Sequence, residues 1–288
     1  VVYVTDMDAY LRGVKPRCAV YKYDPVNMCN GNYINEHTDI SLGGRFKLEF
    51  KRFYNALDIS EKSLGVGWTH SFEKRIYEDN DKLRIDYPDG SSGSFACINA
   101  KKQLYMEEHG EPGILEKLTD GYVLRQDSGE FERYDVRGYL IAFGDNDGEN
   151  VSFVYEKSEG KRLLSKVVAK NSNTLTFSYF KDGKNLGLIE KVTDQTGRSV
   201  FYAYEDRRLV EIKEPDQATR RFTYDSENRI KDVINAKGIT SITNEYDSEG
   251  RTVEQSFPDE TVMTYEYADE KKTCTATEQN GNMVIYTH

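Results

Sequence analysis

The feature that most constrains this chain is a tyrosine that recurs at the end of short aromatic segments through its second half. The seven spacings between successive tyrosines all lie between 19 and 25 residues, which is difficult to obtain by chance. The recurring tyrosines are Tyr134, Tyr155, Tyr179, Tyr204, Tyr224, Tyr246, Tyr267 and Tyr286. A period of this length is typical of a repeat architecture in which each unit is one supersecondary element.

Several of these tyrosines are followed by aspartate and, three residues later, by glycine or asparagine. An aspartate side chain accepts hydrogen bonds from backbone amides ahead of it, and glycine or asparagine tolerates positive φ. The pattern therefore predicts a tight turn after each such tyrosine. The turn residues are Asp135 and Gly138, Asp225 and Asn228, and Asp247, Gly250 and Arg251.

The residues around the turns alternate as they do in β-strands. Val200, Tyr202 and Tyr204 fall on one face, with Phe201 and Ala203 on the other. A second segment rich in Val, Ile, Leu and Phe follows each turn, so one repeat consists of two short strands and two turns. We predict an all-β fold of antiparallel hairpins.

The first half of the chain lacks the repeat but also has the pattern of strands. We expect strands over residues 46–54, 71–77, 83–87, 94–98 and 103–106, with a turn at Tyr87-Pro88-Asp89-Gly90. We predict three parts: an N-terminal segment of residues 1–23, an all-β domain of residues 24–120 and the repeats of residues 121–288. No linker separates the last two cleanly.

Composition and charge exclude several classes of protein. The 39 basic and 49 acidic residues give a net charge of −10, so the chain lacks the basic footprint of a nucleic-acid-binding protein. No segment approaches the ~20 apolar residues of a membrane-spanning helix, and no signal peptide opens the chain. Cys18, Cys29, Cys97 and Cys274 fit no zinc spacing; unpaired thiols are favoured over a Cys18–Cys29 disulfide.

The residue patterns predict no catalytic, cofactor-binding or metal site. His70 and Ser71 are neighbours on an expected strand, so they point to opposite faces and do not form a dyad. The histidines are not paired at the spacing of metal ligands, and the acidic turn of residues 144–150 lacks the ligand order of a calcium loop. We expect this chain to have no enzymatic activity and no cofactor.

The tyrosine–aspartate turns at Tyr134, Tyr224 and Tyr246 resemble the YD repeats of Rhs and teneurin-type proteins. Segments of the first half are similar to the opening motif of bacterial Rhs shells. These segments are Asp24-Pro25-Val26-Asn27, Gly31-Asn32-Tyr33, Arg52-Phe53-Tyr54-Asn55 and Gly65-Val66-Gly67-Trp68-Thr69-His70-Ser71-Phe72. The resemblance points to Asp24, Pro25, Asn27, Gly31, Asn32, Gly65, Gly67 and Trp68 as residues of an opening motif, and to Tyr134, Tyr204, Tyr224, Tyr246 and Tyr267 as the repeat ladder.

The resemblance implies that the hairpins wind as a curved or spiral sheet, a partial shell. In the family the complete spiral closes into a hollow shell around a C-terminal segment, often a toxin. This chain has about seven repeats and lacks the family's C-terminal boundary motif, so we interpret it as a fragment or a short relative. The implied function is that of a non-enzymatic shell segment of a secreted or cell-surface bacterial protein. Its partners would be a C-terminal effector absent from this chain or further repeats of the same parent chain.

Two alternative functions remain open. Tyrosine can cover a sheet with two wetted faces, so exposed tyrosine faces could bind glycans in an extracellular carbohydrate-binding or adhesion module. An all-β glycoside hydrolase is the more distant alternative. A truncated spiral would also expose an edge strand, which could pair with a second chain as an edge-strand dimer.

Overall fold

The computed structural model describes residues 21–22, 25–44, 47–80, 82–108, 113–158 and 160–287. Almost all of its regular elements are strands, and the antiparallel all-β fold is confirmed. In the described residues the single helical element is one 3₁₀ turn, η1 (Asp269–Lys271). Most of the expected N-terminal segment lies outside the described residues.

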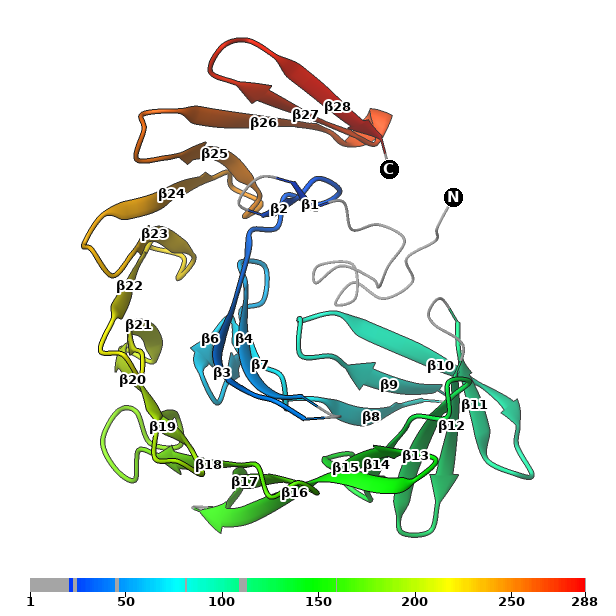
Figure 1. The fold of residues 1–288 in the computed structure, drawn as a ribbon. Helices are drawn as coiled ribbons and strands as arrows, with labels where there is room; N and C mark the ends of the chain where they lie inside the picture. The colour runs from blue at the N-terminus through cyan, green and yellow to red at the C-terminus, as the bar shows by residue number, and fades with distance from the viewer. Residues whose placement is uncertain are drawn as a thin grey trace.

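The largest element is one antiparallel sheet, called the wall below, in which each strand pairs with the next along the chain (Figure 1). Its strands are β8 (Arg75–Asp79), β9 (Lys82–Asp86), β10 (Ser92–Asn99), β11 (Leu104–Glu107), β12 (Gly113–Leu118), β13 (Gly121–Gln126), β14 (Phe131–Asp135), β15 (Leu140–Asp145), β16 (Gly148–Ser158), β17 (Lys161–Ala169), β18 (Thr174–Tyr179), β19 (Ile189–Asp194), β20 (Ser199–Glu205), β21 (Arg208–Lys213), β22 (Thr219–Tyr224), β23 (Ile230–Ile234), β24 (Thr240–Tyr246), β25 (Thr252–Ser256), β26 (Val262–Ala268), β27 (Thr273–Glu278) and β28 (Met283–Thr287). The wall therefore contains both the repeats and the strands of residues 75–118, which precede them.

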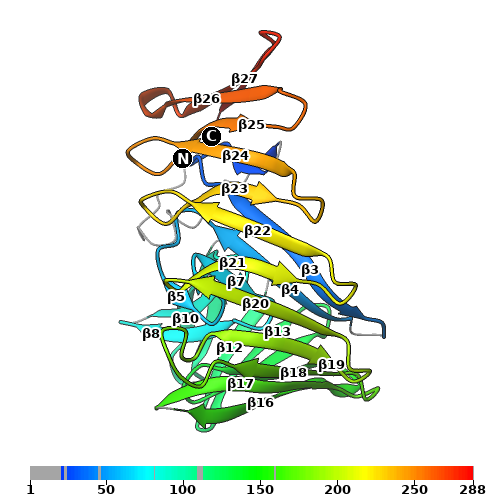
Figure 2. The ribbon, with the colours of Figure 1, turned by 90° about the vertical axis from the view of Figure 1, so that its left-hand side faces the viewer.

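A three-stranded antiparallel sheet, called the inner sheet, lies on the concave side of the wall (Figure 1). It is formed by β3 (Ile34–Leu42), β4 (Leu48–Asn55) and β7 (Trp68–His70). Two short hairpins accompany it: β1 (Tyr21–Lys22) with β2 (Val26–Asn27), and β5 (Glu61–Lys62) with β6 (Gly65–Val66). Turned by 90°, the wall strands follow one another as successive rungs, with β3 and β4 crossing behind them (Figure 2).

The core lies between the inner sheet and the concave face of the wall. Phe50 of β4 packs edge-on against Phe177 and Tyr202 of the wall, with ring centroids 5.5 and 6.3 Å apart. Trp68 packs against Phe222, and Phe72 against Phe153. The expectation of two wetted sheet faces is therefore wrong where the inner sheet covers the wall, because opening-segment aromatics remove that concave face from water.

Alternation along the wall strands matches this arrangement. On β20, Val200 and Tyr202 are buried while Phe201 and Ala203 are exposed, as the sequence pattern predicted. Phe201 retains 45% of its accessible surface because it lies on the outer face. A strand with one buried face and one solvent-exposed face needs fewer apolar residues than a strand that is buried on both faces. This requirement agrees with the polar composition of the chain.

Backbone hydrogen bonds close the first part of the wall against itself. Arg75 of β8 forms an isolated antiparallel bridge with Tyr139, and the Ile76 amide donates to the Gly138 carbonyl (2.9 Å). The strands from β8 to β15 are thereby drawn into a closed turn of sheet. The turn after Tyr134 thus joins the beginning of the wall to the first repeat.

The strand expected over residues 71–77 is wrong in its first half. β7 ends at His70, and the Glu73 amide donates to the His70 carbonyl (2.8 Å), which forms a turn before β8 begins at Arg75. The strands expected at 83–87, 94–98 and 103–106 correspond to β9, β10 and β11 within one or two residues.

Candidate functional site

The turns after the repeat tyrosines share one hydrogen-bond pattern. In each, the aspartate Oδ1 accepts two backbone amides, from the second and fourth residues ahead; the distances are 2.9 and 3.0 Å at Asp135, 2.9 and 2.8 Å at Asp225, and 2.9 and 2.9 Å at Asp247. The fourth residue of each turn has positive φ: 77° at Gly138, 66° at Asn228 and 83° at Gly250. Aspartate at the first position and glycine or asparagine at the fourth are what this geometry requires.

The repeat tyrosines form a ladder that joins each repeat to the one before it. Their hydroxyls donate to backbone carbonyls 15 or 16 residues earlier, each in a preceding strand. The pairs are Tyr155 to Leu140, Tyr179 to Leu164, Tyr204 to Ile189, Tyr224 to Leu209, Tyr246 to Ile230 and Tyr267 to Thr252, at 2.6–2.8 Å. Tyr134 differs, because its hydroxyl donates to Glu132 Oε2 (2.5 Å).

The carbonyls that receive these bonds lie beside irregularities in the sheet. The pairing register shifts next to the repeat tyrosine in hairpin after hairpin, as between Ala203 and Tyr204, where Tyr204 then pairs with Leu209. A bulge of this kind leaves backbone groups out of the regular ladder. The Leu209 carbonyl is the group to which Tyr224 of the next repeat donates. Burial raises the pKa of Tyr204 and Tyr246 well above the ordinary value, so these hydroxyls stay protonated as donors.

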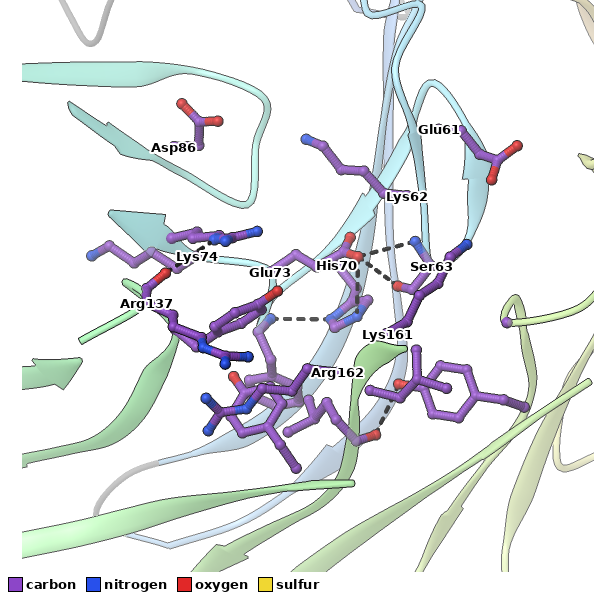
Figure 3. Close-up of a pocket in the computed structure, with 18 of the residues that line it drawn as sticks. Glu61, Lys62, Ser63, His70, Glu73, Lys74, Asp86, Arg137, Lys161 and Arg162 are labelled. Carbon is purple, nitrogen blue, oxygen red and sulfur yellow. Dashed lines mark hydrogen bonds and ion pairs between the residues drawn. The ribbon is translucent and has the colours of Figure 1, made fainter. Parts of the chain in front are cut away.

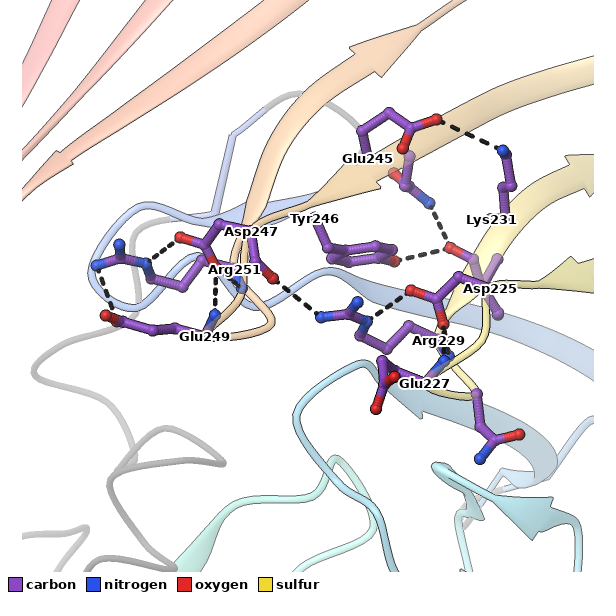
Figure 4. Close-up of polar contacts among 12 residues, drawn as sticks. Asp225, Glu227, Arg229, Lys231, Glu245, Tyr246, Asp247, Glu249 and Arg251 are labelled. Atoms are coloured by element: carbon purple, nitrogen blue, oxygen red, sulfur yellow. Dashed lines mark hydrogen bonds and ion pairs between the residues drawn. The ribbon is translucent and has the colours of Figure 1, made fainter.

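Arginines connect neighbouring turns along one side of the wall (Figure 4). Arg229 Nε donates to Asp225 Oδ2 (2.7 Å) and its Nη1 reaches the Asp247 carbonyl (3.3 Å). Arg251 repeats the arrangement, with Asp247 Oδ2 at 2.7 Å and Asp269 at 3.0 Å. The guanidinium groups of Arg229 and Arg251 lie 4.7 and 4.8 Å from the ring centroids of Tyr246 and Tyr267.

The charge state of Asp247 follows from these contacts. Partial burial raises the pKa of this carboxyl, but hydrogen bonds from the Arg251 side chain and the turn amides outweigh it, so the pKa lies below its usual value. Asp247 is therefore ionised at neutral pH and can accept all of its bonds in the turn.

The opening motif lies where the first segment meets the wall. The Gly31 carbonyl accepts the Thr252 amide of β25 (2.8 Å), and the Val66 amide beside Gly65 donates to the Arg207 carbonyl (3.3 Å). A Cβ at Gly31 would lie 2.4 Å from Arg251 Cβ. A Cβ at Gly65 would lie 2.4 Å from the Arg207 oxygen, so both glycines permit close approach of two backbones.

The remaining motif residues hold the opening turn or anchor it. Asn27 Oδ1 accepts the Cys29 amide, Asn32 Oδ1 accepts the Leu57 amide and the Pro25 carbonyl accepts the Ile34 amide, at 3.0–3.2 Å. Gly67 has φ +73° and lies against Tyr54 and Asn55. Trp68 is fully buried, and its Nε1 donates to the Tyr224 hydroxyl (3.1 Å), which connects the motif to the ladder. Asp24 lies outside the described residues.

A buried ion pair beneath this junction was not identified from the sequence. Arg52 Nε donates to both carboxylate oxygens of Asp39 (3.0 and 3.1 Å), and both side chains are fully buried. Tyr202 of the wall donates its hydroxyl to Asp39 Oδ2 (2.7 Å). The Arg52 guanidinium also lies over the rings of Trp68 and Phe222, 5.3 and 5.8 Å from their centroids. Only its position inside the opening motif, between Phe50 and Tyr54, could have drawn attention to Arg52.

Other residues considered for chemistry have structural contacts. The Ser71 hydroxyl lies 2.7 Å from the Glu49 carbonyl, and His70 Nδ1 accepts the Phe72 amide, so the two do not face each other. No group of three or more potential metal ligands occurs among the described residues. Cys97 and Cys274 form no disulfide within the described residues, and the Cys18–Cys29 alternative cannot be placed because Cys18 lies outside them.

Valine at Gly250 is expected to lower the free energy of unfolding by about 1–3 kcal/mol, because it forces a β-branched residue to positive φ. Valine at Gly138 should cost more, since its Cβ would also lie 2.0 Å from the Ile76 carbonyl oxygen at the wall closure. Urea denaturation followed by circular dichroism measures both. An unchanged free energy of unfolding for Gly250→Val would contradict the turn assignment, and equal losses in the two variants would contradict the closure.

Replacement of Tyr204 by phenylalanine is expected to lower the free energy of unfolding by about 1–2 kcal/mol, because it removes the hydroxyl that donates to the Ile189 carbonyl. The matched control is Tyr105→Phe, because among the described residues the Tyr105 hydroxyl has one long contact, to Gln103 (3.4 Å). This variant should change the free energy of unfolding by less than about 0.5 kcal/mol. Chemical denaturation of the two variants makes the comparison. Equal effects would mean that the ladder bonds do not join the repeats.

Comparison with known proteins gives three further findings. A family profile described as "Domain of unknown function (DUF6531)" matches residues 23–95. The chain is 24% identical over 282 residues to "Probable deoxyribonuclease RhsB" of Dickeya dadantii (strain 3937), covering 87% of this chain and 18% of the relative. It is 22% identical over 257 residues to "Double-stranded DNA deaminase toxin A" of Burkholderia cenocepacia (strain H111), covering 85% of this chain and 18% of the relative. The chain thus spans less than a fifth of the length of these relatives.

Among solved structures, a crystal structure of TcdB2-TccC3 matches with a TM-score of 0.33 and 8% identity, over 85% of this chain and 16% of that chain. The structure of a Photorhabdus luminescens Tc holotoxin pore matches with a TM-score of 0.32 and 9% identity, over 83% and 15% of the two chains.

A wall of tyrosine–aspartate hairpins wound around an inner sheet defines the class of YD-repeat β-proteins. The sequence matches confirm the more specific resemblance of this chain to Rhs-type YD-repeat proteins.

Proposed function

We propose that this chain is a non-enzymatic wall segment of an Rhs-type toxin shell, which encloses or presents a C-terminal effector that lies outside these residues. The observation that carries the proposal is the ladder: each repeat is joined to the one before by the same tyrosine-to-carbonyl bond, so the wall lengthens by adding repeats. Such an arrangement makes a long curved surface from short local units.

Two further observations support a wall rather than a glycan-binding module. The last strand, β28, leaves Met283 and Ile285 67% and 66% exposed, which suits continuation of the sheet by a further hairpin. The repeat tyrosines donate their hydroxyls to backbone carbonyls, and arginines lie over the rings of Tyr246 and Tyr267. These rings are therefore not free to stack on sugars, so the geometry does not favour the glycan-binding alternative.

The proposal places the parent protein outside the cell or at its surface, where a toxin shell acts. Among the described residues no helix has the length and apolar character needed to cross a membrane. An edge-strand dimer stays a prediction, to be tested by sedimentation of the isolated chain.

The test uses the complete parent protein, produced with its C-terminal region. After limited proteolysis, the C-terminal region should remain intact and co-elute with the wall on size-exclusion chromatography. The same region produced alone is the control and should be digested. Equal digestion rates in the two samples would contradict enclosure. Turnover of DNA or of chromogenic glycosides by residues 1–288 alone would contradict the non-enzymatic assignment.

A further inference from the structure

A pocket of about 550 Å³ lies where the inner sheet, the wall closure and two repeats meet (Figure 3). The β5 hairpin and the turn after β7 form one side, and β8 with the turn at Arg137 forms another. The beginning of β17 and the turn at Arg207 complete it. Its volume is within the range of small-molecule sites. The proposed shell function makes no use of this pocket.

The pocket gathers cations in a chain whose net charge is −10. Seven basic side chains line it: Lys62, Lys74, Arg75, Arg137, Lys161, Arg162 and Arg207. Four of these are paired with carboxylates, as Lys62 with Asp58, Lys74 with Glu132, Arg162 with Asp135 and Arg207 with Glu61. Within the described part of the chain, Arg75, Arg137 and Lys161 have no carboxylate within ion-pair distance.

Local contacts hold the Arg75 side chain and the Arg137 backbone, and Lys161 begins a wall strand. The Arg75 guanidinium lies 4.2 Å from the ring centroid of Tyr139 and 4.9 Å from that of Tyr77, and its Nε reaches the Arg137 carbonyl (3.4 Å). The backbone of Arg137 is fixed because its amide donates to Asp135 Oδ1 (2.9 Å). Lys161 is the first residue of β17. The cations therefore converge from three separate elements on one pocket.

The acidic lining groups do not neutralise them. Glu61 forms an ion pair with Arg207 and has a weaker electrostatic interaction with Lys161, and Asp86 lies 3.1 Å from Arg84. Glu73 Oε1 accepts the amide and hydroxyl of Ser63 (3.1 and 2.6 Å). His70 adds no charge, because burial holds its pKa below the usual value. Among the described residues, the pocket therefore has three cations without an ion pair and one further carboxylate, that of Glu73, so its net charge is positive.

We propose that this pocket binds a ligand through a phosphoryl group, with Arg75, Arg137 and Lys161 as the binding residues. Guanidinium groups match the geometry of phosphate oxygens and bind them in pairs, while a lysine ammonium supplies a compact positive charge. A phosphate ester of a sugar or nucleoside and free phosphate both present a phosphoryl group.

Titration calorimetry on the chain as it stands tests the proposal with inorganic phosphate, pyrophosphate and ribose 5-phosphate, against sodium chloride at matched ionic strength. Saturable binding of at least one phosphoryl probe is expected. Lys161→Gln and Arg137→Gln, both exposed positions, should each weaken it by about tenfold or more, because each removes a charge-assisted contact. The control Lys191→Gln, on the outer face over Phe201, should leave the affinity unchanged.

A further variant is expected to have the opposite effect on phosphate affinity. Glu73→Gln removes the remaining negative charge and should strengthen phosphate binding. Tighter binding of ribose 5-phosphate than of inorganic phosphate would assign the ligand to the esters, and equal binding would assign it to free phosphate. The proposal is overturned if no probe binds beyond the chloride control, or if Lys161→Gln and Arg137→Gln bind as tightly as the unmodified chain.

Discussion

Replacement of Arg52 by alanine is expected to lower the free energy of unfolding by about 3–5 kcal/mol, because it leaves a buried carboxylate without its cation. Asp39 has no exposed side-chain surface, and its remaining partners are Tyr202 and His37. The loss also removes a guanidinium packed over Trp68. Urea denaturation followed by circular dichroism measures the change.

The pH dependence of this variant identifies the cause. In the native chain, burial raises the pKa of Asp39. The charge of Arg52 and the hydrogen bonds with His37 and Tyr202 lower this pKa by more than burial raises it, so it lies below its usual value. The pair therefore stabilises the chain above the unfolded-state pKa, and this contribution is lost as the pH falls through the native pKa.

In Arg52→Ala the effect of burial dominates, and the native pKa of Asp39 should rise above its unfolded value. The loss of stability should then be greatest near about pH 7 and shrink toward about pH 5, where the carboxyl takes up a proton. The control is Arg52→Met combined with Asp39→Asn, which removes both charges and should cost less at neutral pH. A loss that is the same at both pH values would contradict an unpaired Asp39 charge as its cause.

Replacement of Trp68 by alanine is expected to cost about 3–5 kcal/mol, because it opens a cavity at the junction of the inner sheet and the wall. The indole is fully buried, with ring centroids 5.1 Å from both Tyr54 and Phe222, and its N–H donates to Tyr224. Chemical denaturation monitored by far-ultraviolet circular dichroism gives the value without relying on tryptophan fluorescence.

The matched control for Trp68 is Phe201→Ala on the outer face of β20. Because Phe201 is already 45% exposed, its loss should cost less than about 1 kcal/mol. Similar losses in the two variants would mean that the inner sheet adds little to the stability of the wall.

The repeats were predictable because their contacts are local. The aspartate of each turn accepts amides two and four residues ahead, and the tyrosine of each hairpin reaches a carbonyl 15 or 16 residues behind. Periods of this kind are visible in a single sequence. The boundaries of the individual strands were less certain, as at residues 71–74, where a turn of four residues follows β7 within an otherwise strand-like segment.

The candidate site was only partly predictable. Trp68, Gly31 and Gly65 stood out through the opening motif, but nothing in the sequence indicated which part of the wall each would meet. Arg207 and Thr252, their partners across the junction, lie in repeats with no distinguishing feature. The phosphoryl pocket was not predicted, because its cations come from segments that begin near residues 75, 137 and 161.

The sequence by itself determined the repeat: its period, the turn geometry after each tyrosine and the antiparallel pairing of successive strands. These depend on interactions between residues less than about one repeat apart. Only the tertiary structure decided that the inner sheet covers the concave face of the wall, that Asp39 and Arg52 form a buried pair with Tyr202, and that Gly138 closes the wall against Ile76. Asp39 and Tyr202 are separated by 163 residues, and their meeting depends on the curvature summed over many hairpins, which no local pattern encodes.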